Sequence, residues 1–172
     1  TLSLDGSTVT GGSRRGVDMT GATATINSST VSSSVDGLFL GGSVGAGSTA
    51  QVSASQITGG VSGAVVGSAS TLTLENSSVS GTGSTGRGIG LFEGTVNAVG
   101  STITGTQNGV VFSDVVGTTD SGRLDLNGSQ VSGTNGSAIA VRATTTAQIN
   151  VNNGSTLVGG NGTMLEVANG AT

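Results

Sequence analysis

Hydrophobic and polar residues alternate along seven short stretches of this 172-residue chain. In most of them two aliphatic residues flank one polar residue, as in Leu2-Ser3-Leu4, and the stretches begin 22 to 28 residues apart. A period of two with one apolar face is typical of a β-strand that is half-buried on a core. The strands expected in this first set begin at Thr1, Thr23, Thr49, Thr71, Thr95, Arg123 and Gln148.

Two further strands are predicted in every repeat. A phrase such as GSTVTG at 6–11 carries one inward aliphatic residue, and a stretch such as GLFL at 37–40 is apolar in its second and fourth places. No apolar stripe with a period of 3.6 residues occurs, so no helix is expected. The third set of strands is expected at 16–19, 37–40, 63–66, 88–91, 109–112, 138–141 and 164–167.

Three short strands in each repeat of this length predict a solenoid. The expected fold is all-β, a right-handed parallel β-helix of about seven coils of 22–28 residues, because parallel crossovers are normally right-handed. Residues 1–172 are expected to be a single β-helix segment of a longer protein. Aliphatic side chains at equivalent positions should stack inside it, in a column that includes Leu4, Ile26, Val52, Leu74, Leu126 and Val151.

Small residues recur at the expected corners. A serine stands two places before the inward aliphatic residue of the second strand, as Ser77 before Val79, and parity turns its side chain inward. We expect these serines to form an internal hydrogen-bonded ladder and not to act as nucleophiles. A glycine such as Gly105 usually closes the second strand, where a sharp corner with positive φ is expected.

The composition narrows the possible functions. Five arginines, no lysine and nine acidic residues leave a net charge of −4, which argues against nucleic acid as a partner. The absence of Cys and His removes disulfides, thiolate metal sites and Ser-His-Asp chemistry. The longest apolar runs are only a few residues, so no membrane insertion of this segment is expected. The sequence therefore indicates no catalytic, cofactor-binding or metal-binding residue.

The units TLTLENSSVSG at 71–81 and TVNAVGSTITGTQNGVVF at 95–112 resemble the pertactin-like passenger domains of Gram-negative autotransporters. The resemblance covers all seven repeats and rests on their pattern and on the absent Cys and Lys. It implies display at the bacterial cell surface or secretion, with roles in adhesion, self-association or virulence. Together with the composition, it leads us to expect a non-enzymatic stalk or adhesin. The partners implied are a host-surface protein or glycan, further copies of the chain, and adjacent domains of the same passenger.

Variable loops are the expected places of contact. The candidate contact residues are Arg14, Arg15, Arg87, Asp114 and Asp120. They lie in the loops at 12–15, 83–87 and 114–122, and a further candidate loop spans 41–48.

An exposed apolar patch for self-association or for a neighbouring domain is expected from the outward residues Phe39, Val65 and Val111.

Two rival functions remain open. The chain could be the scaffold of a carbohydrate-active or other passenger enzyme. A glycosidase needs two carboxylates close together, but Asp5 and Glu75, which share a column, are about 14 Å apart by strand spacing. The chain could also bind ice through outward threonines such as Thr71 and Thr73, although other residues interrupt their columns.

Two short motifs fit the corners of the solenoid better than a ligand site. GTGSTG at 81–86 matches a dinucleotide fingerprint, but a strand follows it where a helix is needed. GGNGTMLEV at 159–167 resembles a calcium-binding repeat but has Met164 where the ligating aspartate should stand.

Overall fold

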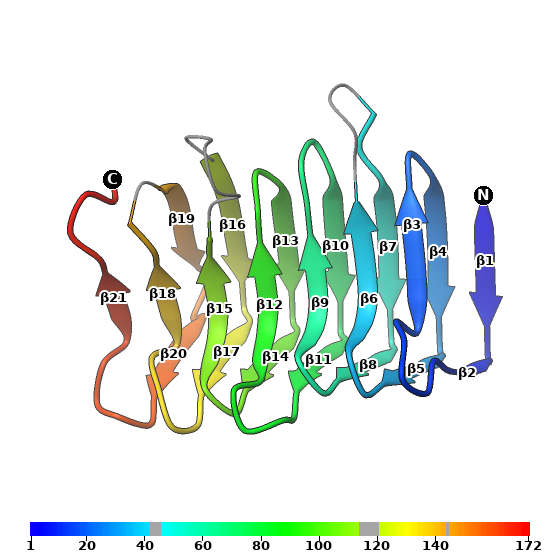
Figure 1. The fold of residues 1–172 in the computed structure, drawn as a ribbon, viewed down its shortest axis with the longest axis horizontal. Helices are drawn as coiled ribbons and strands as arrows, with labels where there is room; N and C mark the ends of the chain where they lie inside the picture. The colour runs from blue at the N-terminus through cyan, green and yellow to red at the C-terminus, as the bar shows by residue number, and fades with distance from the viewer. Residues whose placement is uncertain (42–45, 114–120, 144) are drawn as a thin grey trace.

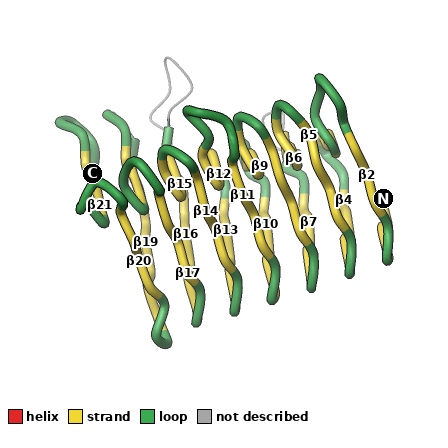
Figure 2. The backbone as a smooth tube through the Cα atoms, turned by 90° about the horizontal axis from the view of Figure 1, so that it is seen from below, coloured by secondary structure: helices red, strands yellow, loops and turns green. Residues whose placement is uncertain are grey.

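The computed structural model describes residues 1–41, 46–113, 121–143 and 145–172. These residues contain no helix and form three parallel seven-stranded sheets, which confirms the predicted parallel β-helix. We name the sheets A, B and C in the order in which the chain reaches them, and each coil crosses all three before the next coil begins. In Figure 1 sheet C lies in front, sheet A behind it and sheet B along the bottom, and Figure 2 shows the coils side by side along the long axis.

The strands keep the order of the three predicted sets. Sheet A consists of β1 (Leu2–Asp5), β4 (Thr23–Asn27), β7 (Thr49–Ser53), β10 (Thr71–Glu75), β13 (Thr95–Val99), β16 (Ser121–Asn127) and β19 (Thr146–Asn152). Sheet B consists of β2 (Thr8–Thr10), β5 (Thr30–Ser33), β8 (Gln56–Gly59), β11 (Ser78–Gly81), β14 (Thr102–Gly105), β17 (Gln130–Gly133) and β20 (Thr156–Gly159). Sheet C consists of β3 (Val17–Thr20), β6 (Asp36–Gly41), β9 (Ser62–Val66), β12 (Arg87–Leu91), β15 (Asn108–Phe112), β18 (Ile139–Val141) and β21 (Leu165–Val167).

The core is a set of aliphatic columns enclosed by the three sheets. In sheet A, strand pairing places Leu4, Ile26, Val52, Leu74, Ala98, Leu126 and Val151 in one register column. The five residues from Ile26 to Leu126 in this column are at most 1% exposed. Stacking equivalent residues buries them on both sides, which one coil alone could not do.

The two ends of this column are less buried than a continuous stack implies. Leu4 is half-buried in β1, and Val151 is 43% exposed in β19. These two strands are the edge strands of sheet A, so each is covered by a neighbouring coil on one side only.

The predicted serine ladder is present at the corner between sheets A and B. The backbone N–H of each ladder serine donates to the Oγ of the serine one coil further on, at 2.9–3.2 Å, from Ser7 through to Ser155. Each Oγ in turn donates to a carbonyl just before the corner, as Ser77 does to Glu75 at 2.8 Å. The ladder therefore supplies an acceptor for the serine N–H groups at the bend.

Replacing Ser77 with alanine should destabilise the protein by about 1–3 kcal/mol, because the buried N–H of Ser55 loses its acceptor. Urea unfolding followed by circular dichroism measures the change. Ser78→Ala is the matched control, since Ser78 starts β11 with its side chain on the outward face, and it should cost less than about 0.5 kcal/mol. Equal losses in the two variants would contradict a structural role for the ladder.

The glycines that close sheet B have a different cause from the one predicted. Gly59, Gly81 and Gly105 do not have positive φ; instead a Cβ on them would lie 1.7–2.0 Å from the backbone oxygen of a residue beginning sheet C. Glycine is needed there because the chain turns back on itself too tightly for any side chain. Positive φ occurs one residue before the serine ladder, at Gly6, Ser28, Ala54, Asn76, Gly100 and Gly128.

Candidate functional site

The outward face of sheet C differs in composition from the other two faces. Its central row is Asp18, Phe39, Val65, Gly90, Val111, Ala140 and Glu166, placed in register by the strand pairing. Between its two charged ends this row is made of small or apolar residues. We call the small and apolar residues of this row, from Phe39 to Ala140, the apolar floor of sheet C. The outward faces of sheets A and B, in contrast, carry mostly polar side chains.

This floor is largely covered and does not form the exposed apolar patch expected from the sequence. Val65 is 7% exposed and Val111 is 4% exposed, and Phe39 is half-buried. The Arg15 guanidinium carbon lies 3.3 Å from the centre of the Phe39 ring, at cation–π distance. The Arg15 side chain thus covers part of the apolar row.

Arg15 is held by two carboxylates at one end of this floor. It lies just before β3, and its nitrogens are 2.9 Å from Asp18 and 3.4 Å from Asp36. The Asp36 side chain is only 10% exposed, so this carboxylate is neutralised next to the floor. The Arg15 guanidinium therefore stacks on Phe39 and pairs with both carboxylates.

Arg87 stands on the same face, three coils further on, and is about 14 Å from Arg15 by strand spacing. Among the described residues its side chain makes one hydrogen bond, from Nε to Ser62 Oγ at 3.0 Å, and no ion pair. Its guanidinium carbon is 5.8 Å from the centre of the Phe92 ring. Burial is the main cause that lowers the pKa of Arg87; Asp36 opposes this shift and Arg142 adds to it. Arginine nevertheless stays protonated at neutral pH, so Arg87 places on this face a positive charge that forms no ion pair with a described residue.

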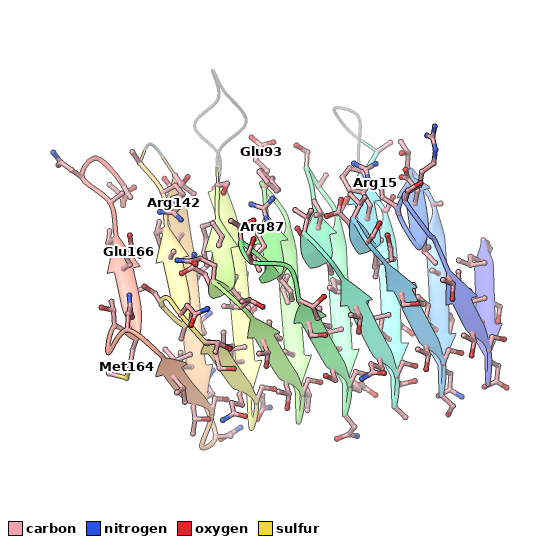
Figure 3. All side chains as sticks on the ribbon, turned by 60° about the horizontal axis from the view of Figure 1, so that its bottom comes forward. Arg15, Arg87, Glu93, Arg142, Met164 and Glu166 are labelled. Carbon is pink, nitrogen blue, oxygen red and sulfur yellow. The ribbon has the colours of Figure 1, made fainter. Side chains whose placement is uncertain are left out.

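The two arginines flank an open groove with a volume of about 420 Å³. Phe39, Val65 and Phe92 supply apolar surface along it, and Val35 and Val61 come from the turns between sheets B and C. The polar side chains that line it are those of Arg15, Asp36, Ser68 and Arg87. Figure 3 shows Arg15, Arg87 and Arg142 following one another along the long axis. A mostly apolar cavity of this size with a few placed polar groups is typical of a small-molecule site.

Glycines make room for the side chains of the groove. A Cβ on Gly90 would lie 3.1 Å from Nε of Arg87 and 3.3 Å from the Phe92 ring. A Cβ on Gly41 would lie 2.6 Å from the Phe39 ring. Both glycines sit in sheet C, where their missing side chains let the larger groups lie flat on the sheet.

The acidic residues of the described chain are spread over the molecule. Apart from Asp18 and Asp36, Asp5 accepts a hydrogen bond from Asn27, Glu93 accepts one from Ser68, and Glu166 pairs with Arg142 at 3.6 Å. Across these described residues no group of three or more possible metal ligands comes together.

One further acid lies in an ion pair on the face of sheet A. A hydrogen bond from Arg123 is the main cause that lowers the pKa of Asp125, and one from Asn150 adds to it.

The structure brings together two of the predicted contact residues. Arg15 and Arg87 line one groove, although they come from different predicted loops. Arg14 is exposed and is not part of the groove lining. Asp114 and Asp120 lie outside the described residues, as do residues 42–45 of the loop at 41–48.

Sequence reasoning missed Asp36, Ser62, Ser68 and Phe92. The first two had a signal in the sequence, because each precedes the glycine that opens a third strand, as Arg15 and Arg87 do. Aligning DGLF and SGAV with RGVD and RGIG places these four residues in one row beside the floor. Ser68 and Phe92 follow sheet C strands, and no repeated pattern marks them.

The outward face of sheet B is uncharged along its whole length and polar except at Val158 in its last strand. One row consists of Thr8, Thr30, Gln56, Ser78, Thr102, Gln130 and Thr156, and the next of Thr10, Ser32, Thr58, Ser80, Thr104, Ser132 and Val158. Hydroxyls of the second row pair between coils, as Thr104 does with Ser132 at 3.1 Å. The face of sheet A is also polar but contains the Arg123–Asp125 ion pair.

When the sequence is compared with known protein families, nearly the whole chain matches one of them. A family model described as a right-handed β-helix region matches residues 1–163, in agreement with the predicted hand of the coil. No curated protein and no solved structure matches the chain. Within the parts of the chain that the structure describes, no helix is long and apolar enough to cross a membrane.

Proposed function

This chain belongs to the right-handed β-helix family, and we propose that it is a non-enzymatic binding rod. It acts as the stalk or adhesin segment of a secreted bacterial autotransporter and is exposed at the cell surface. Its ligand is a host-surface glycan or glycoprotein, which it contacts through many weak interactions along the rod.

The observation that carries this proposal is the uncharged polar face of sheet B. Its hydroxyl and amide groups repeat once per coil, at the strand spacing of about 4.8 Å, over all seven strands. Hydroxyl and amide side chains both donate and accept hydrogen bonds, as sugar hydroxyls do. A row of such groups on a rigid support favours multivalent binding, in which weak contacts add up along an extended ligand.

The face of sheet B can be tested by adding charge without changing shape. We expect Gln56→Glu combined with Gln130→Glu to lower retention of the protein on glycan-coated or host-cell-coated surfaces about tenfold, a loss of about 1.4 kcal/mol. Both glutamines are exposed, so the fold should be kept. The matched control is Gln51→Glu combined with Gln148→Glu, which adds the same charge to the face of sheet A. Equal loss in both double variants, or none in either, would contradict the proposal.

The enzyme alternative predicts a different result. Turnover of polysaccharide or ester substrates by this segment, lost in Asp114→Asn or Asp120→Asn, would replace a binding function by catalysis.

Ice binding is favoured by the same uncharged face and would show as thermal hysteresis that Thr30→Tyr and Thr102→Tyr abolish. The adhesin proposal expects no hysteresis, because cross-coil hydroxyl pairs such as Thr58–Ser80 at 3.3 Å already engage part of the face.

A further inference from the structure

The groove on sheet C offers a positive charge next to an apolar surface. We propose that it binds a small carboxylic acid with an apolar body, such as an aromatic or branched aliphatic acid, whose carboxylate contacts Arg87. This inference goes beyond adhesion and does not rest on it, because it concerns another sheet and a ligand of another size.

The free hydrogen-bonding capacity of Arg87 is the first support. A guanidinium group has five N–H donors, and Nε already donates to Ser62. Among the described residues no group accepts a hydrogen bond from the four N–H donors on the two terminal nitrogens. A planar guanidinium with free terminal nitrogens matches a carboxylate in a two-point contact.

The surroundings of Arg87 favour a ligand over water as the partner for its charge. Arg87 is half-buried, so its interaction with an anion is screened less than on an open surface. Its hydrogen bond to Ser62 and its closeness to Phe92 restrict its side chain. The site is therefore partly ordered before an anion arrives, which lowers the entropic cost of binding.

Charge balance distinguishes the two arginines of the groove. Arg15 is 2.9 Å from Asp18 and 3.4 Å from Asp36, so its charge is already neutralised. The single charge of Arg15 offsets only one of these two carboxylates, so this end of the groove keeps a net charge of −1. Arg87 is then the group that makes the groove attractive for an anion.

The apolar lining selects the body of the ligand. Phe39, Val61, Val65 and Phe92 line the groove together, and Val61 is 43% exposed at its edge. Covering this surface favours a ring or branched chain over a sugar, whose hydroxyls would lose water against apolar groups. The volume of about 420 Å³ accommodates a small organic acid and not a long polymer.

The test uses 3-phenylpropionate with the full chain, followed by two-dimensional amide NMR. Saturable shifts are expected at Gly41, Gly67 and Phe92, which lie in or beside the groove. Neutral 3-phenylpropionamide should bind about tenfold more weakly, since hydrogen bonds to a charged partner are stronger than those to a neutral one. Glucuronate, which keeps the carboxylate but lacks an apolar body, should also bind about tenfold more weakly.

Two arginine variants distinguish the contribution of Arg87 to ligand binding from the effect of removing any positive charge from the protein. Arg87→Gln should weaken 3-phenylpropionate about tenfold or more, while Arg123→Gln on sheet A should leave it unchanged. Val61→Asp provides a second variant at an exposed edge position, and its added anion should also weaken binding about tenfold, whether or not Arg87→Gln folds.

Several results would overturn this inference: equal affinity for the amide, tighter binding of glucuronate, loss of binding in Arg123→Gln, or no saturable shifts in the groove. Adhesion of the sheet B variants is measured separately. Failure of one proposal therefore leaves the other standing.

Discussion

Replacing Gly105 with alanine should destabilise the protein by about 3 kcal/mol or more and abolish cooperative unfolding of the coils around it. Gly105 ends β14 at the corner between sheets B and C, and a Cβ there would lie 1.8 Å from the backbone oxygen of Asn108. This oxygen belongs to the backbone, so it cannot rotate away from the added Cβ as the end of a flexible side chain could. The turn must therefore open, and opening it displaces β15 from its place between β12 and β18.

Gly12→Ala is the control that separates crowding from backbone conformation. Gly12 has φ of +54°, but nothing lies within 4 Å of the position of its Cβ. An alanine there should cost about 1–2 kcal/mol for the left-handed conformation alone. Urea unfolding of both variants, followed by circular dichroism, compares the two costs. A midpoint for Gly105→Ala equal to that of the parent chain would show that the corner can relax, against the present account.

Replacing Leu74 with alanine should have the second large effect, a loss of about 3–5 kcal/mol. Leu74 is fully buried in β10, and its register neighbours Val52 and Ala98 lie above and below it in the same column. Removal of its side chain leaves a cavity in the middle of a stack. The strands on both sides are tied to other coils and cannot easily close that cavity.

Leu4→Ala is the matched control, because Leu4 occupies the same column in edge strand β1 but is only half-buried. Its loss should cost about 1 kcal/mol, in proportion to the smaller apolar area that it covers. Thermal and urea unfolding measure both variants. If Leu4→Ala were as costly as Leu74→Ala, burial within the stack could not be the source of the difference.

Several parts of the fold could be predicted because their signals are local and repeated. Alternation around Ser3 or Thr73 marks the core-facing side of a strand without any knowledge of its neighbours. The serine before each inward aliphatic residue was assigned correctly to a ladder, since parity alone turns Ser77 toward the corner. The reason for Gly105 was predicted wrongly, because positive φ and crowding both select glycine and the sequence does not distinguish them.

The groove was less predictable. Arg15 and Arg87 were each identified as loop residues, but only the coil register places both on one face with Asp36 between them in the row. Val65 and Val111 were expected to be exposed, yet both are buried. The conformations of long side chains such as Arg15 depend on several coils at once, and no repeat pattern encodes them.

By itself the sequence determined that this chain is a stack of three-stranded coils with aliphatic columns inside and polar residues outside, because that pattern follows from the two-residue period of a strand and the length of the repeat. Only the tertiary structure decided that one arginine would be neutralised by two carboxylates while another, three coils away, would keep its charge beside an apolar groove. That outcome depends on which side chains of neighbouring coils meet across the face of sheet C. Such contacts join residues far apart in the chain, so they exist only once the coils are stacked.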